Sequence, residues 1–190
     1  DIPVEKAARC YANQSMGRKS PENGARTWLL KFEMLRHEGF GYEKLIYIDG
    51  DTLCIGELLG LTNISPHFGV NCRKNSKRGY IKFGGKKINA GVMILGKRLL
   101  TKKMWAELVQ QRYELADKFP SGDQIAWQHY FAGKEIYNIP TKFNQSRDNF
   151  NKGKETAIIH YHGHKPWEIS KGFTDADALW FEYSQEVKDA

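Results

Sequence analysis

Apolar residues at helical spacing mark two segments of the chain as helices. In residues 26–37 (RTWLLKFEMLRH) apolar side chains recur every three or four positions, and Gly39 and Gly41 follow. Residues 101–119 show the same spacing and end at Pro120, which cannot continue a helix. This spacing therefore predicts that both segments form amphipathic helices that bury one face.

Two further helices are predicted from their capping residues. Residues 123–131 form a short segment that Ser121 or Asp123 would cap. Near the end of the chain, Asp177 follows Thr174 by three positions, which is a variant of the capping box. Apolar residues come next, so the tail also predicts a helix.

Short apolar runs between these helices predict β-strands. They lie at residues 44–48, 91–95, 135–139 and 157–161. Because strands and helices alternate, we predict an α/β fold with a mainly parallel central sheet flanked by helices. In such sheets, ligands bind beyond the carboxyl ends of the strands.

Composition narrows the class of protein. The length of 190 residues fits one domain, and 41% hydrophobic with 27% charged residues indicates a globular protein rather than a disordered one. No stretch approaches the roughly 18 apolar residues that span a bilayer. Cys10, Cys54 and Cys72 are odd in number and lack zinc-type spacing. We therefore expect reduced thiols and a cytoplasmic protein.

Positive charge is concentrated in the middle of the chain. The formal net charge is +7, and no acidic residue occurs between Glu57 and Glu107. A solvated loop and helix end would explain the basic run at 73–103. The same run would also attract phosphates of a nucleotide, a nucleic acid or an anionic membrane surface. A non-catalytic anion- or nucleic-acid-binding module is therefore one alternative for the function.

The run LIYIDGD ends a predicted strand with two carboxylates. Asp49 and Asp51 flank Gly50 directly after residues 45–48. In one interpretation this is only a turn, because Asp and Gly are both common in turns. In the other, the two carboxylates converge on a divalent cation, which prefers oxygen ligands and removes their mutual repulsion.

A second polar group follows the last predicted strand, in IIHYHGHKPW. His160, His162 and His164 alternate there, and such a triplet could bind zinc by itself or form a polar loop. Gly163 and Lys165 add an exposed backbone N–H and a cation, which are the two groups that hold a phosphate.

Four segments occur in the order in which glycosyltransferase family 8 has its motifs. They are LIYIDGDTLC, INAGVMIL, GDQIAWQHYF and IIHYHGHKPW. The chain resembles this family, which includes glycogenin and bacterial lipopolysaccharide galactosyltransferases, over residues 26–167. The resemblance implies a GT-A fold, a nucleotide-sugar donor that is usually a UDP-sugar, and Mn²⁺ or Mg²⁺. It also implies transfer of a hexose, with retention of configuration, to a hydroxyl of a glycan, lipid-linked or protein acceptor. No nucleic-acid partner is expected, whereas peripheral contact with an anionic membrane surface remains an option.

The resemblance also implies roles for individual residues. The metal ligands would be Asp49, Asp51 and His160. The donor would be held by Lys31, Asn89, Ala90, Gly91, Gly163 and Lys165. Asp123 and Gln124 would lie at the reaction centre, although a helix N-cap is the alternative for Asp123. Phe143 and Asn144 match a pair that is structural in the family.

The chain departs from the family in two places. The loop before Lys165 is one residue shorter than usual. Family members also begin with a strand that holds uracil and ribose, whereas only 48 residues precede Asp49 here and residues 1–24 show no clear strand. We therefore expect residues 1–190 to form a single GT-A domain that is a fragment or is shortened at its N-terminus.

Overall fold

A five-stranded sheet forms the centre of the molecule. The computed structural model describes residues 31–36, 38–72, 79–84, 87–115, 122–163, 165–168 and 172–189. The strands of the large sheet are, in spatial order, β1 (Lys44–Ile48), β5 (Ile88–Gly96), β3 (Phe68–Cys72), β6 (Glu135–Asn138) and β4 (Gly79–Lys82). The expected strand at 44–48 is thus confirmed, and those at 91–95 and 135–139 correspond to most of β5 and β6.

The large sheet is mixed. Its β1–β5, β5–β3 and β6–β4 pairs are antiparallel, and its β3–β6 pair is parallel. The prediction of a mainly parallel sheet is therefore wrong for the described strands, although the α/β class is confirmed. The reason is that β3, β4 and β5 follow one another with no described helix between them, so consecutive strands do not need helical crossovers.

A second, smaller sheet lies beside the first. It contains β2 (Thr52–Cys54), β8 (Ile158–His160) and β7 (Gln145–Ser146) in that spatial order. Strand β8 is the strand predicted at 157–161. The short helix α3 (Leu59–Thr62) follows β2 along the chain, and short 3-10 helices lie at Glu38–Gly41, Lys97–Leu99, Thr141–Phe143 and Arg147–Asn149.

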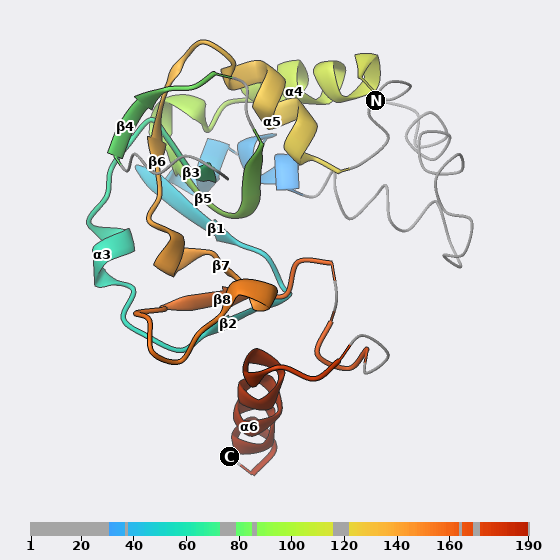
Figure 1. The fold of residues 1–190 in the computed structure, drawn as a ribbon. Coiled ribbons are helices and arrows are strands. Elements are labelled where there is room, and N and C mark those ends of the chain that lie inside the picture. The colour runs from blue at the N-terminus through green and yellow to red at the C-terminus, as the bar shows by residue number, and fades with distance from the viewer. Residues whose placement is uncertain are drawn as a thin grey trace.

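Helices cover one face of the large sheet. Residues 31–36 are helical, and α4 (Lys102–Glu114) and α5 (Gln124–Phe131) lie side by side over the strands (Figure 1). Buried side chains from all three helices join those of the sheet in one apolar cluster. The predicted helix at 101–119 begins as expected, because the Thr101 side chain accepts a hydrogen bond from the Met104 N–H at 3.1 Å. Residues 116–121, including Ser121, lie outside the described residues, as do residues 1–30 and 37.

The opposite face of the large sheet packs against the small sheet. Val92 and Ile94 of β5 are buried there with Phe143 and Ile158. Side chains of β5 therefore enter apolar clusters on both faces of the sheet. Strand β5 is therefore packed on both sides. Its first residues include Asn89, Ala90 and Gly91, which are predicted to hold the donor and to line its sugar pocket.

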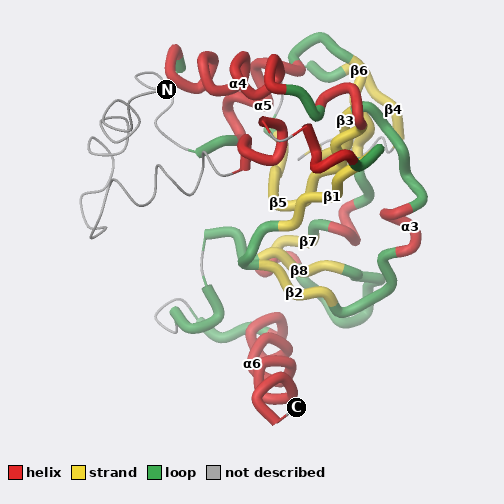
Figure 2. Tube along the Cα trace, turned by 180° about the vertical axis from the view of Figure 1, so that it is seen from behind, coloured by secondary structure: helices red, strands yellow, loops and turns green. Residues whose placement is uncertain are grey.

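The last helix, α6 (Asp175–Asp189), lies beyond the small sheet and points away from the large one (Figures 1 and 2). Its predicted capping box is confirmed, since Asp177 accepts a hydrogen bond from the Thr174 N–H at 2.8 Å and donates its own N–H to the Thr174 hydroxyl at 3.4 Å. None of the helices within the described residues is long and apolar enough to cross a membrane.

Candidate functional site

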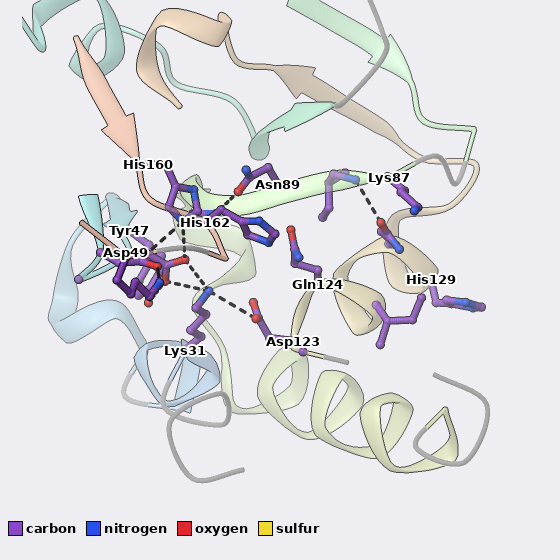
Figure 3. A pocket seen from close by; sticks show the side chains of 18 of the residues that line it. Lys31, Tyr47, Asp49, Lys87, Asn89, Asp123, Gln124, His129, His160 and His162 are labelled. Carbon is purple, nitrogen blue, oxygen red and sulfur yellow. Dashed lines mark hydrogen bonds and ion pairs between the residues drawn. The ribbon is translucent and has the colours of Figure 1, made fainter. Parts of the chain in front are cut away.

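One large cavity opens where the two sheets and α5 meet. It has a volume of about 1130 Å³, and its walls come from the end of β1, the start of β5, the start of α5 and the end of β8. Figure 3 shows the labelled side chains of this cavity, with Lys31, Asp49 and His160 pointing toward one another. Most of the residues that the sequence predicts for the site line this cavity, although they come from segments far apart in the chain.

The Asp-Gly-Asp stretch is the turn that joins the two sheets. The Asp49 N–H donates to the Gly91 carbonyl at 2.8 Å, which extends the β1–β5 ladder by one residue. The Thr52 hydroxyl then donates to the Asp49 carbonyl at 2.8 Å, and β2 begins at Thr52. The stretch is therefore a turn, as in the first interpretation. The same turn also brings both carboxylates to the cavity, as the second interpretation requires.

The small sheet carries His160 to the same place. Thr52 and His160 are partners in the β2–β8 pair, and the Tyr161 N–H donates to the Asp51 carbonyl at 2.9 Å. His160 Nε2 lies 3.3 Å from Asp51 Oδ1 and 3.7 Å from Asp49 Oδ2. One ligand atom from each of these three residues lies within 4.8 Å of the others. The three side chains predicted as metal ligands are thus brought together.

The strand beneath the histidine bulges toward the site. Val70 pairs with Met93, but the next residue of β3, Asn71, pairs with Asn89, so residues 90–92 have no partner on β3. Such irregularities often lie beside functional sites, where they re-aim side chains. Here the bulge brings Gly91 against the imidazole, because a Cβ on Gly91 would lie 2.1 Å from His160 Cε1. Only glycine leaves room for the ring in this position.

Hydrogen bonds fix the predicted sugar-pocket segment from two directions. Gln124 on α5 accepts the Ala90 N–H at 3.0 Å through Oε1, and Asn89 Oδ1 accepts the Gly91 N–H at 3.0 Å. Asn89 and Gly91 line the cavity, whereas Ala90 contributes only through its backbone.

Asn144 connects this strand to the histidine. Its Nδ2 donates to the Asn89 carbonyl at 3.1 Å, and its Oδ1 lies 2.9 Å from His160 Nδ1. All three residues are buried. The contact with His160 goes beyond the structural role expected from the sequence.

Two lysines face the carboxylates. Lys31 Nζ lies 2.8 Å from Asp49 Oδ1 and 3.4 Å from Asp123 Oδ1. Lys165 Nζ pairs with Asp51 Oδ2 and donates to the Tyr161 carbonyl at 3.1 Å, so it reaches the site in spite of its shorter loop. These ammonium groups balance the charge of the carboxylates.

The pKa shifts follow from these pairs. Burial lowers the pKa of Lys31, but Asp123 and Asp49 together outweigh burial and raise it above its ordinary value. Burial alone would raise the pKa of Asp51. Contacts with the His160 ring and the Lys165 ammonium outweigh that effect and hold the Asp51 pKa well below its usual range.

Asp123 is buried at the start of α5 but does not cap that helix with its side chain. Only 4% of the residue is exposed, and its Oδ2 has no hydrogen-bond partner within the described part of the chain. Burial raises the pKa of Asp123, Lys31 lowers it and Asp49 raises it, with a net increase. The Asp123 carboxylate therefore does not act as the N-cap of α5, which was the alternative role for this residue. The carboxylate belongs to the cavity wall instead.

Some cavity residues were missed by the sequence interpretation. The Tyr47 hydroxyl donates to Asp49 Oδ1 at 2.7 Å, and burial, followed by this hydrogen bond, raises the pKa of Tyr47. Tyr47 lies two residues before Asp49, and alternation along a strand could have placed both on one side. Further residues of the wall are Lys87, Gln128 and His129, whose local pattern does not distinguish them. His162 of the predicted histidine triplet also lines the cavity.

One residue predicted to hold the donor stands apart from the cavity. Gly163 does not line the cavity, and its φ of 90° places it in the left-handed region that favours glycine. His164 lies outside the described residues.

The donor set fits a divalent cation. Two carboxylates and one imidazole form a mixed oxygen and nitrogen set of the kind that binds divalent cations. The imidazole is 2% exposed and packs in the space that Gly91 leaves for it. The trio is therefore preformed on two sheets.

Solved structures with the same fold are glycosyltransferases. GlyE from Streptococcus pneumoniae TIGR4 matches with a TM-score of 0.63 and 17% identity, over 81% of this chain and 42% of GlyE. The galactosyltransferase LgtC, solved with donor and acceptor sugar analogues, matches with a TM-score of 0.62 and 18% identity, over 94% of this chain and 72% of LgtC. The chain thus spans less than half the length of GlyE. No curated protein sequence matches it.

The structural likeness shows that the fold is GT-A. At the sequence level, the family pattern described as Glycosyl transferase family 8 matches residues 18–170, which is most of the chain. The matched residues include the Asp-Gly-Asp turn, the bulged strand, the start of α5 and His160. The chain therefore belongs to glycosyl transferase family 8.

Proposed function

We propose that this chain is a metal-dependent, retaining glycosyltransferase that moves a hexose from a nucleotide-sugar, most simply a UDP-sugar, to a hydroxyl of a glycan, lipid-linked or protein acceptor. The observation that carries the proposal is the convergence of Asp49, Asp51 and His160 on one cavity. Membership of the family and the presence of Lys165 beside the carboxylates support it.

The diphosphate end of the donor would lie at the Asp-Asp-His trio. Asp49, Asp51 and His160 would hold the cation, which would act as a Lewis acid and neutralise charge on the leaving diphosphate. The Lys165 ammonium would add a second positive charge beside the phosphates, and the Gly163 N–H would add a donor. These groups matter most as the bond to the anomeric carbon breaks, because negative charge then grows on the leaving group.

The sugar would lie along the bulged strand. Asn89 uses its Oδ1 for the Gly91 N–H, which leaves the amide nitrogen to donate to a sugar hydroxyl. Positive charge develops on the ring during transfer, and the buried Asp123 carboxylate and Gln124 Oε1 would stabilise it. Lys31 keeps Asp123 oriented, and the Ala90 N–H holds Gln124. We assign no covalent nucleophile; the departing phosphate would deprotonate the acceptor hydroxyl.

A polyanion-binding module remains the alternative from another class. Basic residues of the run 73–103 support it, but they do not explain a buried histidine beside two carboxylates in a cavity. A trio of this kind attracts cations rather than phosphates. No described contact favours the alternative.

The test is a screen of nucleotide-sugars. Purified protein is incubated with UDP-, GDP- and ADP-hexoses, with Mn²⁺ or with EDTA, and released nucleoside diphosphate is measured together with the anomer of any product. We expect release from a UDP-hexose that requires Mn²⁺ and is absent in Asp49→Asn. Release that is unaffected by EDTA would contradict metal dependence, and no release from any donor would contradict the proposed activity.

A further inference from the structure

We propose that Asn144 is a positioning residue that fixes the ring tautomer of His160, so that Nε2 presents a lone pair to a cation. The inference rests on the proposed function, because it concerns the same cavity. The inference adds Asn144 to the candidate site, whereas the sequence indicates only a structural role for this residue. The argument uses three buried side chains and the atoms that each presents to the next.

The first step is the orientation of the Asn144 amide. A backbone carbonyl can only accept hydrogen bonds, so the group of Asn144 that lies 3.1 Å from the Asn89 carbonyl has to be the NH₂. The reversed amide would bring two carbonyl oxygens together at that distance. With Asn89 3% and Asn144 2% exposed, solvent cannot relieve such a contact. The side-chain oxygen of Asn144 therefore faces the histidine.

The second step is the protonation of the imidazole. Asn144 Oδ1 can only accept, and it lies 2.9 Å from His160 Nδ1, so Nδ1 carries a proton. In a neutral ring the other nitrogen, Nε2, is then unprotonated. The ring has little room to turn as well, since a Cβ at Gly91 would lie 2.1 Å from Cε1 and 2.2 Å from Nδ1, so the backbone of Gly91 lies close against this part of the ring.

The third step concerns the atoms that lie opposite His160 Nε2. It faces Asp51 Oδ1 at 3.3 Å and Asp49 Oδ2 at 3.7 Å. If the proton were on Nε2, the ring would donate to Asp51 and its lone pair would not be available as a ligand. By holding the proton on Nδ1, Asn144 makes the lone pair converge with the two carboxylates.

The first measurement is the tautomer itself, in metal-free wild-type protein. Long-range ¹H–¹⁵N spectra at alkaline pH, where a histidine ring is neutral, distinguish the two tautomers. The signals of His160 among the six histidines are assigned by their loss in His160→Gln. We expect the proton on Nδ1. A proton on Nε2 would overturn the proposal without any variant of Asn144.

The second measurement is Mn²⁺ affinity, by calorimetry on folded variants. Asn144→Ala removes the acceptor, and we expect a loss of about 10- to 100-fold, the usual effect of removing such a partner. Asn144→Asp keeps an oxygen toward Nδ1 and should retain the Nδ1–H tautomer, whereas its second oxygen loses the hydrogen bond to the Asn89 carbonyl and should lower stability. Asn151→Ala, at an exposed position, is the control and should change nothing.

The outcomes separate the two proposals. Equal Mn²⁺ affinity in wild type and a folded Asn144→Ala would overturn the role of Asn144 while leaving the proposed function intact. If wild type binds no Mn²⁺, the metal-dependent function fails, and the tautomer spectrum alone decides whether Asn144 holds the ring. If Asn144→Ala does not fold, Asn144→Asp and the wild-type spectrum carry the test.

Discussion

Among single residues, Lys165 offers the clearest test of whether the site binds the phosphates of a nucleotide or its base. Its ammonium pairs with Asp51 of the Asp-Asp-His trio, and Lys165 belongs to a loop rather than to either sheet. Both Lys165 and Asp51 are partly exposed in this pair, so a change at Lys165 should affect the ligand more than the fold.

Replacing Lys165 by alanine should weaken binding of UDP but not of uridine. Only the diphosphate meets the ammonium, and a charge-assisted contact contributes about 1.5–3 kcal/mol, so the dissociation constant for UDP should rise about tenfold or more. Calorimetry with both ligands in Mn²⁺ measures this. Lys97→Ala, which removes a surface partner of Glu43, is the matched control. Equal losses for UDP and uridine would make Lys165 structural.

At the scale of elements, α5 completes the edge of β5. Strand β1 pairs with β5 only from Val92 to Gly96, so the first residues of β5 extend past it. Gln124 and Gln128 lie one helical turn apart and accept the N–H groups of Ala90 and Ile88. Two side chains of the helix thus replace the strand that is missing at this edge.

The Gln128→Leu variant should lose this support at Ile88. Leaving a buried N–H without an acceptor costs about 1–3 kcal/mol, with the lower end expected because the cavity admits water. Hydrogen exchange at the Ile88 amide should accelerate, whereas Gln128→Glu keeps an acceptor and should protect it. Unchanged exchange in Gln128→Leu would show that the helix does not hold the strand.

A buried ion pair attaches helix α6 beside the apolar contacts that Ala176 and Trp180 make with Tyr161. Arg147 Nε and Nη2 donate to the two carboxylate oxygens of Asp177 at 2.7 and 2.6 Å, and both side chains are buried. Burial raises the pKa of Asp177, but hydrogen bonds from Arg147 and Thr174 outweigh it and hold the pKa below its ordinary value. The pair therefore stabilises the fold only while Asp177 is ionised.

Because the folded-state pKa of Asp177 lies below the unfolded value of about 3.9, its contribution is complete above that pH and is lost as the pH falls further. We expect Asp177→Asn to lower the free energy of unfolding by about 3–5 kcal/mol at pH 7, and by less at pH 3, which lies below the unfolded pKa of about 3.9. Urea titrations at both values measure the difference. Asp175→Asn removes an exposed carboxylate from the same helical turn and should have little effect. A pH-independent loss would contradict the assignment.

For the whole molecule, sequence patterns located the elements that carry strong local signals. Helical spacing of apolar residues predicted α4, the capping residue Thr174 predicted the start of α6, and apolar runs predicted β1 and β8. The central strand β3 was missed because Gly69 and Asn71 interrupt its apolar run, although every residue of the strand is buried. Its burial depends on partners distant in the chain, which a local pattern does not contain.

The candidate site was predictable to the extent that family motifs named its residues. The sequence did not indicate that Asn144 contacts His160, or that Tyr47 contacts Asp49. Both contacts depend on how two sheets meet at the Asp-Gly-Asp turn. The β5 bulge is equally non-local, since it depends on the register between Asn71 and Asn89.

The central claim is that the junction of the two sheets binds a nucleoside diphosphate through a divalent cation. The most direct measurement is calorimetric titration of UDP into wild type and Asp51→Asn, each with Mn²⁺ and with EDTA, after far-UV circular dichroism has shown that both are folded. We predict that wild type binds UDP at least about tenfold more tightly with Mn²⁺, since a charge-assisted contact contributes about 1.5–3 kcal/mol, and that Asp51→Asn loses this gain. Equal affinity of wild type in Mn²⁺ and EDTA, or a full Mn²⁺ response in Asp51→Asn, would contradict it.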